Sequence, residues 1–133
     1  SWVKRVTLML DQVSTNGTSN YLVQIGDSAI SSSGYISSSQ RGASSTTAEA
    51  SYTTGFGIIV AAATVGLTGS VTITLSGIGT KWVAHGVLFD TAAGNTLYTT
   101  AGMKALSAAL ARVRLTTVSG DTFDAGAVSL LYE

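Results

Sequence analysis

The stretch "GSVTITLSG" (residues 69–77) carries the clearest strand pattern in the chain. Its apolar residues alternate strictly with hydroxyl residues: Val71, Ile73 and Leu75 against Thr72, Thr74 and Ser76. A period of two places the two sets on opposite faces of a β-strand. An apolar face beside a hydroxyl face is typical of an antiparallel sheet that packs on a core with one side only. The stretch therefore predicts an antiparallel β fold.

Further strand-like segments recur along the 133 residues. They lie at 2–10, 21–27, 56–62, 69–77, 81–90, 95–107, 111–120 and 125–133, with a short one around Tyr35 and Ile36. Gly, Ser, Asn and Asp separate most of them, and Asn16-Gly17 is the strongest turn pair. Eight or nine short strands at this spacing predict an all-β fold, an antiparallel jelly-roll-like β-sandwich, in one domain over residues 1–133.

Two segments leave alternatives open. In "GMKALSAALARV" (102–113), Met103, Leu106, Leu110 and Val113 fall at helical spacing, and alanine favours helices. The Thr-rich flanks favour two strands that divide near residues 107–109. The Ser-rich stretch 31–50 is either a mobile loop or an exposed edge.

The composition limits the classes of partner. Charged residues make up 11%, against a usual value of about 25%, and seven basic residues balance seven acidic ones. Such a chain lacks the excess of basic residues that attracts the phosphates of nucleic acid, so we expect no nucleic-acid partner. No apolar run approaches the roughly 18 residues of a membrane span, so we expect no membrane insertion. The low charge indicates either a surface buried in an assembly or a polar surface of Ser and Thr.

The residues that carry catalysis or bind metals are sparse. His85 is the only histidine and lies mid-strand, and the chain has no Cys and no Gly-x-Ser-x-Gly elbow. Loop carboxylates suit calcium, yet the aspartates lack the spacing of a calcium loop, and such residues commonly form turns. Asp121 and Asp124 bracket Phe123 in one such turn. We therefore predict no catalytic residue, no metal site and no cofactor, and we do not expect an enzyme.

Aromatic rings next to planar polar groups are typical of sugar-binding surfaces. The stretch "GYISSSQRG" (34–42) offers Tyr35, Gln40 and Arg41, and Tyr52 follows nearby. These four residues are the candidate carbohydrate-binding residues. For Tyr35, packing in the core is an equal alternative.

The segments 81–90 and 127–132 carry apolar residues on both faces. A strand that is apolar on both faces is either central in its sheet or lies at a subunit contact. We expect Trp82, Val128, Leu130 and Tyr132 to form a subunit interface.

The last third of the chain, "TTAGMKALSAALARVRLTTVSGDTFDAGAVSLLYE" (99–133), resembles the C-terminal domain that recurs in phage tail fibres, tailspikes and related virion proteins. The stretches "STNGTSNYLVQIGD" (14–27) and "SYTTGFGI" (51–58) agree with the resemblance. It implies a homotrimer in the phage tail of the virion, in the C-terminal part of a longer protein. It also implies that any glycan-cleaving site would lie in an upstream domain.

The expected function is that of a non-catalytic distal domain, which trimerises a tail fibre and contacts host cell-surface polysaccharide during adsorption. One alternative is an independent carbohydrate-binding module without a trimerisation role. The third and least favoured is a polysaccharide-cleaving enzyme.

Overall fold

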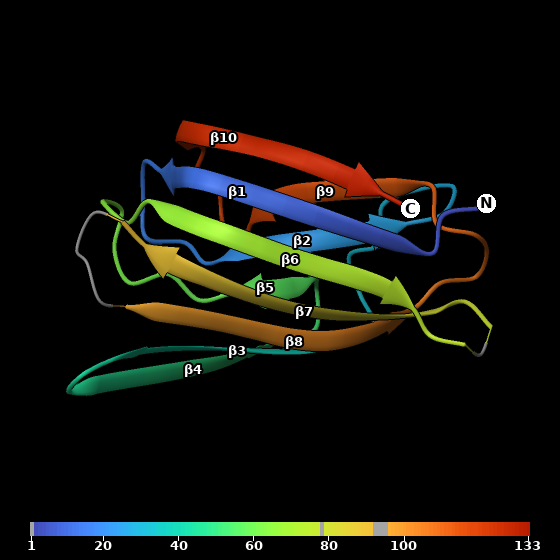
Figure 1. Ribbon diagram of the computed structural model, residues 1–133, viewed down its shortest axis with the longest axis horizontal. Helices are drawn as coiled ribbons and strands as arrows, with labels where there is room; N and C mark the ends of the chain where they lie inside the picture. The colour runs from blue at the N-terminus through green and yellow to red at the C-terminus, as the bar shows by residue number, and fades with distance from the viewer. Residues whose placement is uncertain (1, 78, 92–95) are drawn as a thin grey trace.

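The computed structural model describes residues 2–77, 79–91 and 96–133 (Figure 1), and in these ranges it contains strands and no helix. The strands are β1 (Arg5–Thr15), β2 (Tyr21–Gly26), β3 (Tyr35–Ala43), β4 (Thr46–Tyr52), β5 (Phe56–Ile58), β6 (Leu67–Leu75), β7 (Lys81–Asp90), β8 (Leu97–Ala105), β9 (Arg112–Thr117) and β10 (Phe123–Tyr132). The predicted all-β fold is confirmed.

The strands form two unequal layers. The larger sheet has the order β10-β1-β6-β7-β8-β3-β4, and the smaller has the order β5-β2-β9. Every paired strand is antiparallel to its neighbour, so the predicted antiparallel sandwich is confirmed. Figure 1 shows the smaller sheet behind the larger one. The chain passes repeatedly from one layer to the other, for example between β1 and β2 and between β9 and β10, and so ties the two sheets together.

The core lies between the two layers and follows the alternation of the sequence. Val71 and Ile73 of β6 are fully buried, whereas Leu75 at the end of the strand is partly exposed. Strand β7 alternates buried and exposed residues over its whole length. From the smaller sheet, Tyr21 and Phe56 are fully buried against this face. Burial of such side chains is the main force that holds the layers together, at about 1.5–3 kcal/mol each.

Strand β1 continues five residues beyond its predicted end and contains a bulge. Gln12 has a φ of 51°, and the register with β6 shifts between Leu10 and Val13. The extra residue turns Val13 back into the core. Opposite the bulge, Gly126 has a φ of 90°, and a Cβ there would lie 2.5 Å from the carbonyl oxygen of Gln12. Only glycine fits at this crossing of β1 and β10.

The structure settles the two segments that the sequence left open. The segment 102–113 is not helical, because β8 ends at Ala105 and β9 begins at Arg112. The Ser-rich stretch forms a hairpin of β3 and β4, with a register that pairs Ser37 with Tyr52 and Ala43 with Thr46. This hairpin forms the edge of the larger sheet opposite β10.

Hydroxyl groups of β3 and β8 in the larger sheet form hydrogen bonds with the backbone at and beside β5 in the smaller sheet. The amide N–H of Gly57 donates to Ser37 Oγ at 3.1 Å, and that of Ile59 donates to Ser39 Oγ at 3.0 Å. Thr100 Oγ1 donates to the Gly57 carbonyl at 2.6 Å. These bonds give partners to backbone groups that the outer edge of a strand would otherwise leave without them. On this side the larger sheet therefore seals the edge of the smaller one.

Replacement of Ser39 by alanine tests whether these hydrogen bonds between the two sheets stabilise the fold. Ser39 Oγ accepts from the Ile59 amide and donates to the Thr99 carbonyl at 2.9 Å, so Ser39→Ala removes the partner of the buried Ile59 amide. We expect the free energy of unfolding to fall by about 1–3 kcal/mol in a urea titration. The matched control is Ser38→Ala on the exposed face of the same strand, for which we expect a change within about 0.5 kcal/mol. Equal effects of the two substitutions would show that the hydrogen bonds of Ser39 do not stabilise the contact between the sheets.

Candidate functional site

The opposite side of the sandwich is open. Strand β10 is the last strand of the larger sheet there, and β9 is the last strand of the smaller one. By register, Val128, Leu130 and Tyr132 lie opposite Leu10, Leu8 and Val6 and share their face. The three β1 residues are buried, yet their β10 partners are 46%, 47% and 55% exposed. The inner face of β10 thus extends beyond the cover of the smaller sheet.

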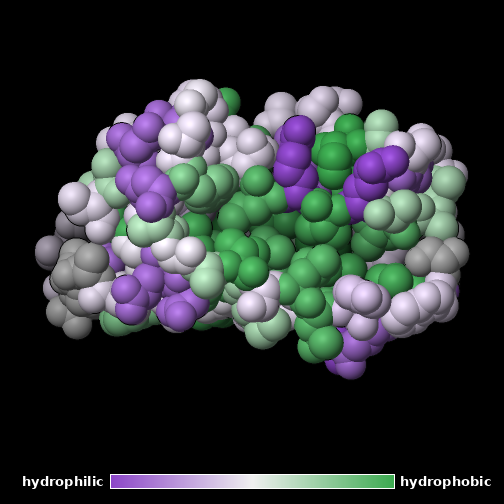
Figure 2. All heavy atoms as spheres, turned by 90° about the horizontal axis from the view of Figure 1, so that it is seen from above, coloured by the Kyte–Doolittle hydropathy of each residue, from purple (hydrophilic) through white to green (hydrophobic). Residues whose placement is uncertain are grey.

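A groove runs between the two edge strands. It has a volume of about 270 Å³. Its lining is formed by Val3, Val6, Leu110, Ala111, Arg112, Val113, Leu130 and Tyr132. Figure 2 views the molecule from the β10 side and shows hydrophobic side chains gathered along the middle of this face, with strongly hydrophilic ones beside them. We call this groove, with the inner face of β10, the open side.

The residues at both ends of the described chain fasten β10 at the open side. The amides of Lys4 and Arg5 donate to the Glu133 carbonyl at 2.6 and 2.9 Å, and the Glu133 amide donates to the Arg5 carbonyl at 2.8 Å. The Arg5 guanidinium also pairs with the Glu133 carboxylate. That pair is about half exposed, so it contributes at most about 1 kcal/mol, and the backbone bonds hold the strand in place.

An exposed aromatic pair lies at one end of the groove. The rings of Trp2 and Tyr132 are 5.7 Å apart and tilted by 54°. Trp2 is 68% exposed, so most of its side chain faces solvent in the single chain. Because large apolar side chains gain free energy from burial, this end of the groove favours contact with another apolar surface.

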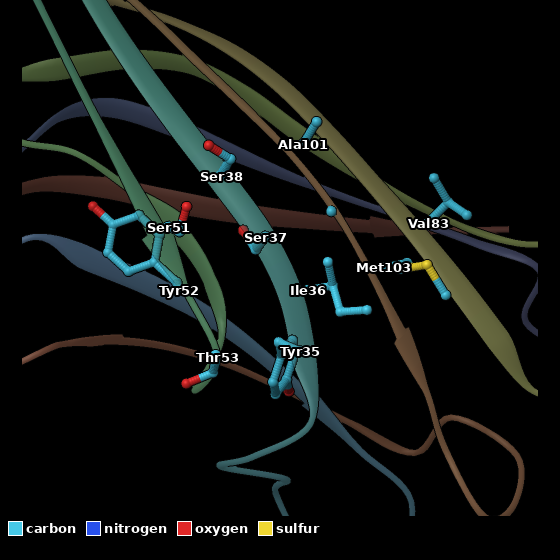
Figure 3. A pocket seen from close by; sticks show the side chains of 11 residues that line it. Tyr35, Ile36, Ser37, Ser38, Ser51, Tyr52, Thr53, Val83, Ala101 and Met103 are labelled. Carbon is cyan, nitrogen blue, oxygen red and sulfur yellow. The ribbon is translucent and has the colours of Figure 1, made fainter.

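The outer face of the larger sheet carries a second, flatter groove of about 570 Å³. Ile36, Met103 and Val83 form a row across β3, β8 and β7. Figure 3 shows these three side chains on neighbouring strands, with Ser51 and Tyr52 along the β4 side. Val87 and Phe89 are also exposed on this face of β7. The second apolar face that the sequence indicated for residues 81–90 therefore lies at the surface, on a strand that is central in its sheet.

The four carbohydrate-binding candidates do not form one site. The Tyr35 ring is buried, and its hydroxyl accepts from the Ile25 amide at 2.8 Å. The carbonyls of Ile25 and Ser31, each 3.0 Å away, are the two acceptors available to its single proton. Tyr52 is also buried, and burial raises the pKa of its hydroxyl to about 12. The prediction that these two rings present a sugar-binding face is wrong. Both rings fill the core because they point inward from β3 and β4.

Gln40 and Arg41 are neighbours on β3, so their side chains leave the sheet on opposite faces. Gln40 is exposed, opposite Glu49 on the outer face. Arg41 is half-buried on the inner face, paired with Tyr98 of β8. The structure therefore does not bring them together.

Trp82 is the interface candidate that the structure corrects. It is 2% exposed and belongs to the core of the single chain, so its indole cannot contact a second subunit. Trp82 and Val83 lie on opposite faces of β7, and the face of Trp82 is the core face. Val128, Leu130 and Tyr132 are exposed, and for them the interface stays a prediction.

The titratable residues of the described ranges do not form a cluster that could bind a metal ion. Within residues 2–77, 79–91 and 96–133, no three His, Asp or Glu side chains lie together as a metal-binding group. Asp121 accepts from the Ser19 amide at 2.8 Å, and hydrogen bonds from Ser19 hold the pKa of its carboxyl below the ordinary value. Asp124 accepts from Ser14 Oγ at 2.7 Å. Both aspartates thus form hydrogen bonds with residues 14–19, the end of β1 and the turn that follows it.

Within residues 2–77, 79–91 and 96–133 the structure contains no helix that could cross a membrane.

No family model, no curated protein and no solved structure matches this chain. The resemblance to virion fibre domains stays a prediction from the sequence.

The sequence did not predict the residues that lie across the groove from β10. The groove residues Val3, Leu110 and Arg112 come from segments that lie far apart in the sequence, and no local pattern marks them. The available signal was the apolar character of both faces of 127–132, which identified β10 but not its partner across the groove.

Removal of the Tyr35 hydroxyl distinguishes a core residue from a sugar-binding one. Tyr35→Phe keeps the ring and loses the hydrogen bonds that its hydroxyl accepts from the Ile25 amide and donates to the Ile25 or Ser31 carbonyl, so we expect a loss of about 1–3 kcal/mol in the free energy of unfolding. Urea unfolding measures it. Ser51→Ala, which removes an exposed hydroxyl from β4, is the control, with an expected change within about 0.5 kcal/mol. An unchanged stability of Tyr35→Phe would contradict the core assignment.

Proposed function

We propose that this chain is the distal domain of a phage tail fibre or tailspike, and that it trimerises through its open side and contacts host cell-surface polysaccharide. One observation carries the trimerisation: the inner face of β10 is apolar, lies in line with the core face of β1, and is uncovered. The resemblance of residues 14–27, 51–58 and 99–133 supports the assignment to a virion fibre.

The contrast between the two sides of the sandwich supports a partner at the open side. Along β5, buried hydroxyl groups satisfy the strand edge within the chain. Along β9 and β10, the edges face solvent and the side chains between them are apolar. A long apolar edge strand invites association, which proteins limit by covering it or by placing charges on it. Between Ala125 and Tyr132, β10 carries no charged residue.

A second copy of the chain has the right chemistry for this surface. The chain is neutral and charge-poor, so association of copies brings no net repulsion. Covering each half-exposed side chain of β10 would contribute about 1 kcal/mol. Three copies, each placing the open side against its neighbour, form a closed ring without leaving an open side at either end. The number three comes from the resemblance to trimeric fibres.

The proposed location is the phage tail of the virion, with host polysaccharide as the external partner. The proposal assigns no catalytic step to this chain and places any polysaccharide cleavage in an upstream domain. An independent carbohydrate-binding module is the competing function, and it would act as a single chain.

A charge placed on the inner face of β10 tests the interface. Leu130 is 47% exposed in the single chain, so Leu130→Glu is tolerated by the fold but leaves a carboxylate buried in the trimer. We expect light scattering behind size exclusion to give the mass of a single chain for this variant and three times the chain mass for the unchanged protein.

The matched control is Leu131→Glu. Leu131 is the next residue of the same strand, is 50% exposed, and points to the outer face. We expect this variant to remain trimeric. A trimer for Leu130→Glu, or a single chain for Leu131→Glu alone, would show that the inner face of β10 is not the contact.

A further inference from the structure

We propose that Arg112 and Arg114 of β9 bind the anionic substituents, carboxylate or phosphate, of a host-surface polysaccharide. The inference rests on the proposed contact with host polysaccharide and assigns that contact a site and a ligand class. It places the site on the outer face of the smaller sheet.

The alternation of β9 brings the two guanidinium groups to one face. Val113 and Leu115 pack against the core, so Arg112 and Arg114 point to the outer face between them. Both arginines are exposed. Two residues along a strand span about 7 Å, so the two side chains start from neighbouring positions.

Neutral groups of β2 and of the turn after it hold both side chains. Arg112 Nε donates to the Ser28 carbonyl at 3.0 Å, and Arg114 Nε donates to Gln24 Oε1 at 2.9 Å. Gln24 is 3% exposed, and its own Nε2 donates to the Thr54 carbonyl at 2.7 Å. The buried amide therefore fixes the plane of the Arg114 guanidinium without neutralising it.

Among the residues that the structure describes, the two positive charges have no carboxylate partner. The ion pair found in the described part of the chain is Arg5 with Glu133, and neither Arg112 nor Arg114 takes part in one. Asp27 lies next to Ser28 in sequence, yet its carboxylate accepts from the amides of Ser107 and Ala108. In a chain with seven basic and seven acidic residues, this leaves a local excess of positive charge on one strand.

The arrangement suits an oxyanion. A guanidinium carries five N–H donors in a plane and binds carboxylate or phosphate oxygens in pairs. The contacts to Ser28 and Gln24 use the Nε–H donors and one Nη group of Arg114, which leaves Nη–H donors of both side chains for a ligand. Because the Nε bonds already fix the side chains, a ligand meets a lower entropic cost than at free arginines. Arg112 also borders the groove of the open side, so the site lies beside the proposed subunit contact.

Affinity electrophoresis in native gels that contain a polysaccharide tests the site. The probes are polygalacturonate for carboxylates, a phosphomannan for phosphates, and dextran as the neutral reference. We expect retardation by at least one anionic polymer and none by dextran. The apparent affinity should fall about tenfold or more in Arg112→Gln and in Arg114→Gln, as expected for the loss of a charge-assisted contact. The polymer that retards the protein identifies the substituent.

Lys81→Gln is the matched control, because it removes the same charge from an exposed position on β7. Retardation should be unchanged in this variant. Arg114→Lys keeps the charge and loses the planar fork, so we expect an intermediate affinity. If Arg114→Gln lowers the melting temperature, Arg112→Gln alone carries the test.

Three results would overturn the site: no retardation by either anionic polymer, equal loss in Lys81→Gln, or equal retardation by duplex DNA, which would show a non-specific polyanion effect. The solution mass of the same samples separates this inference from the proposed function. A trimer without retardation rejects the anion site and leaves the fibre domain in place. A single chain rejects the trimeric fibre domain whatever the gels show.

Discussion

The pairing of β10 with β1 is the constraint on which the rest of the structure depends. Backbone hydrogen bonds add a seventh strand to a sheet that has only three strands opposite it. The register aligns Val128, Leu130 and Tyr132 with the core face of β1, and the bonds between Lys4, Arg5 and Glu133 fasten the end of the strand. The smaller sheet cannot cover a layer of this width. An apolar strand is thereby held in place at the surface, and the open side follows directly from the mismatch of the two layers.

The two sides of the sandwich deal with their edges in different ways. Hydroxyl groups of Ser37, Ser39 and Thr100 satisfy the edge at β5 within the chain, so that side needs no partner. The groove between β9 and β10 has apolar walls instead, and only a partner can cover them. Arg112 borders this groove and Arg114 lies on the outer face of β9, so the proposed ligand contact adjoins the proposed assembly contact on the same strand.

Residues that alternate in hydropathy made much of the fold predictable from the sequence. The strands around Val71, Trp82 and Val113 follow directly from apolar and polar residues in period two. The β3–β4 hairpin was hidden because Ser37 and Ser39 replace apolar side chains and bury their hydroxyls in hydrogen bonds, which hydropathy does not register. The direction of Tyr35 and Trp82 was also hidden, since an aromatic residue fits a core, an interface or a sugar site equally well. Only the register of the sheet decides between these, and it buries both rings. The arginine pair was missed because Gln24, Ser28 and β9 meet only in the folded chain.

The central claim is that the open side is covered by other copies of the chain, and hydroxyl-radical footprinting of the unchanged protein tests it most directly. In the single chain, Tyr132 is 55% exposed on the open side and Phe89 is 44% exposed on the outer face, so the two rings form an internal comparison. The account predicts that Tyr132 is oxidised much more slowly than Phe89, because a neighbouring subunit covers it. Oxidation of Tyr132 at a rate equal to or above that of Phe89 would show that the open side faces solvent, and would contradict the account.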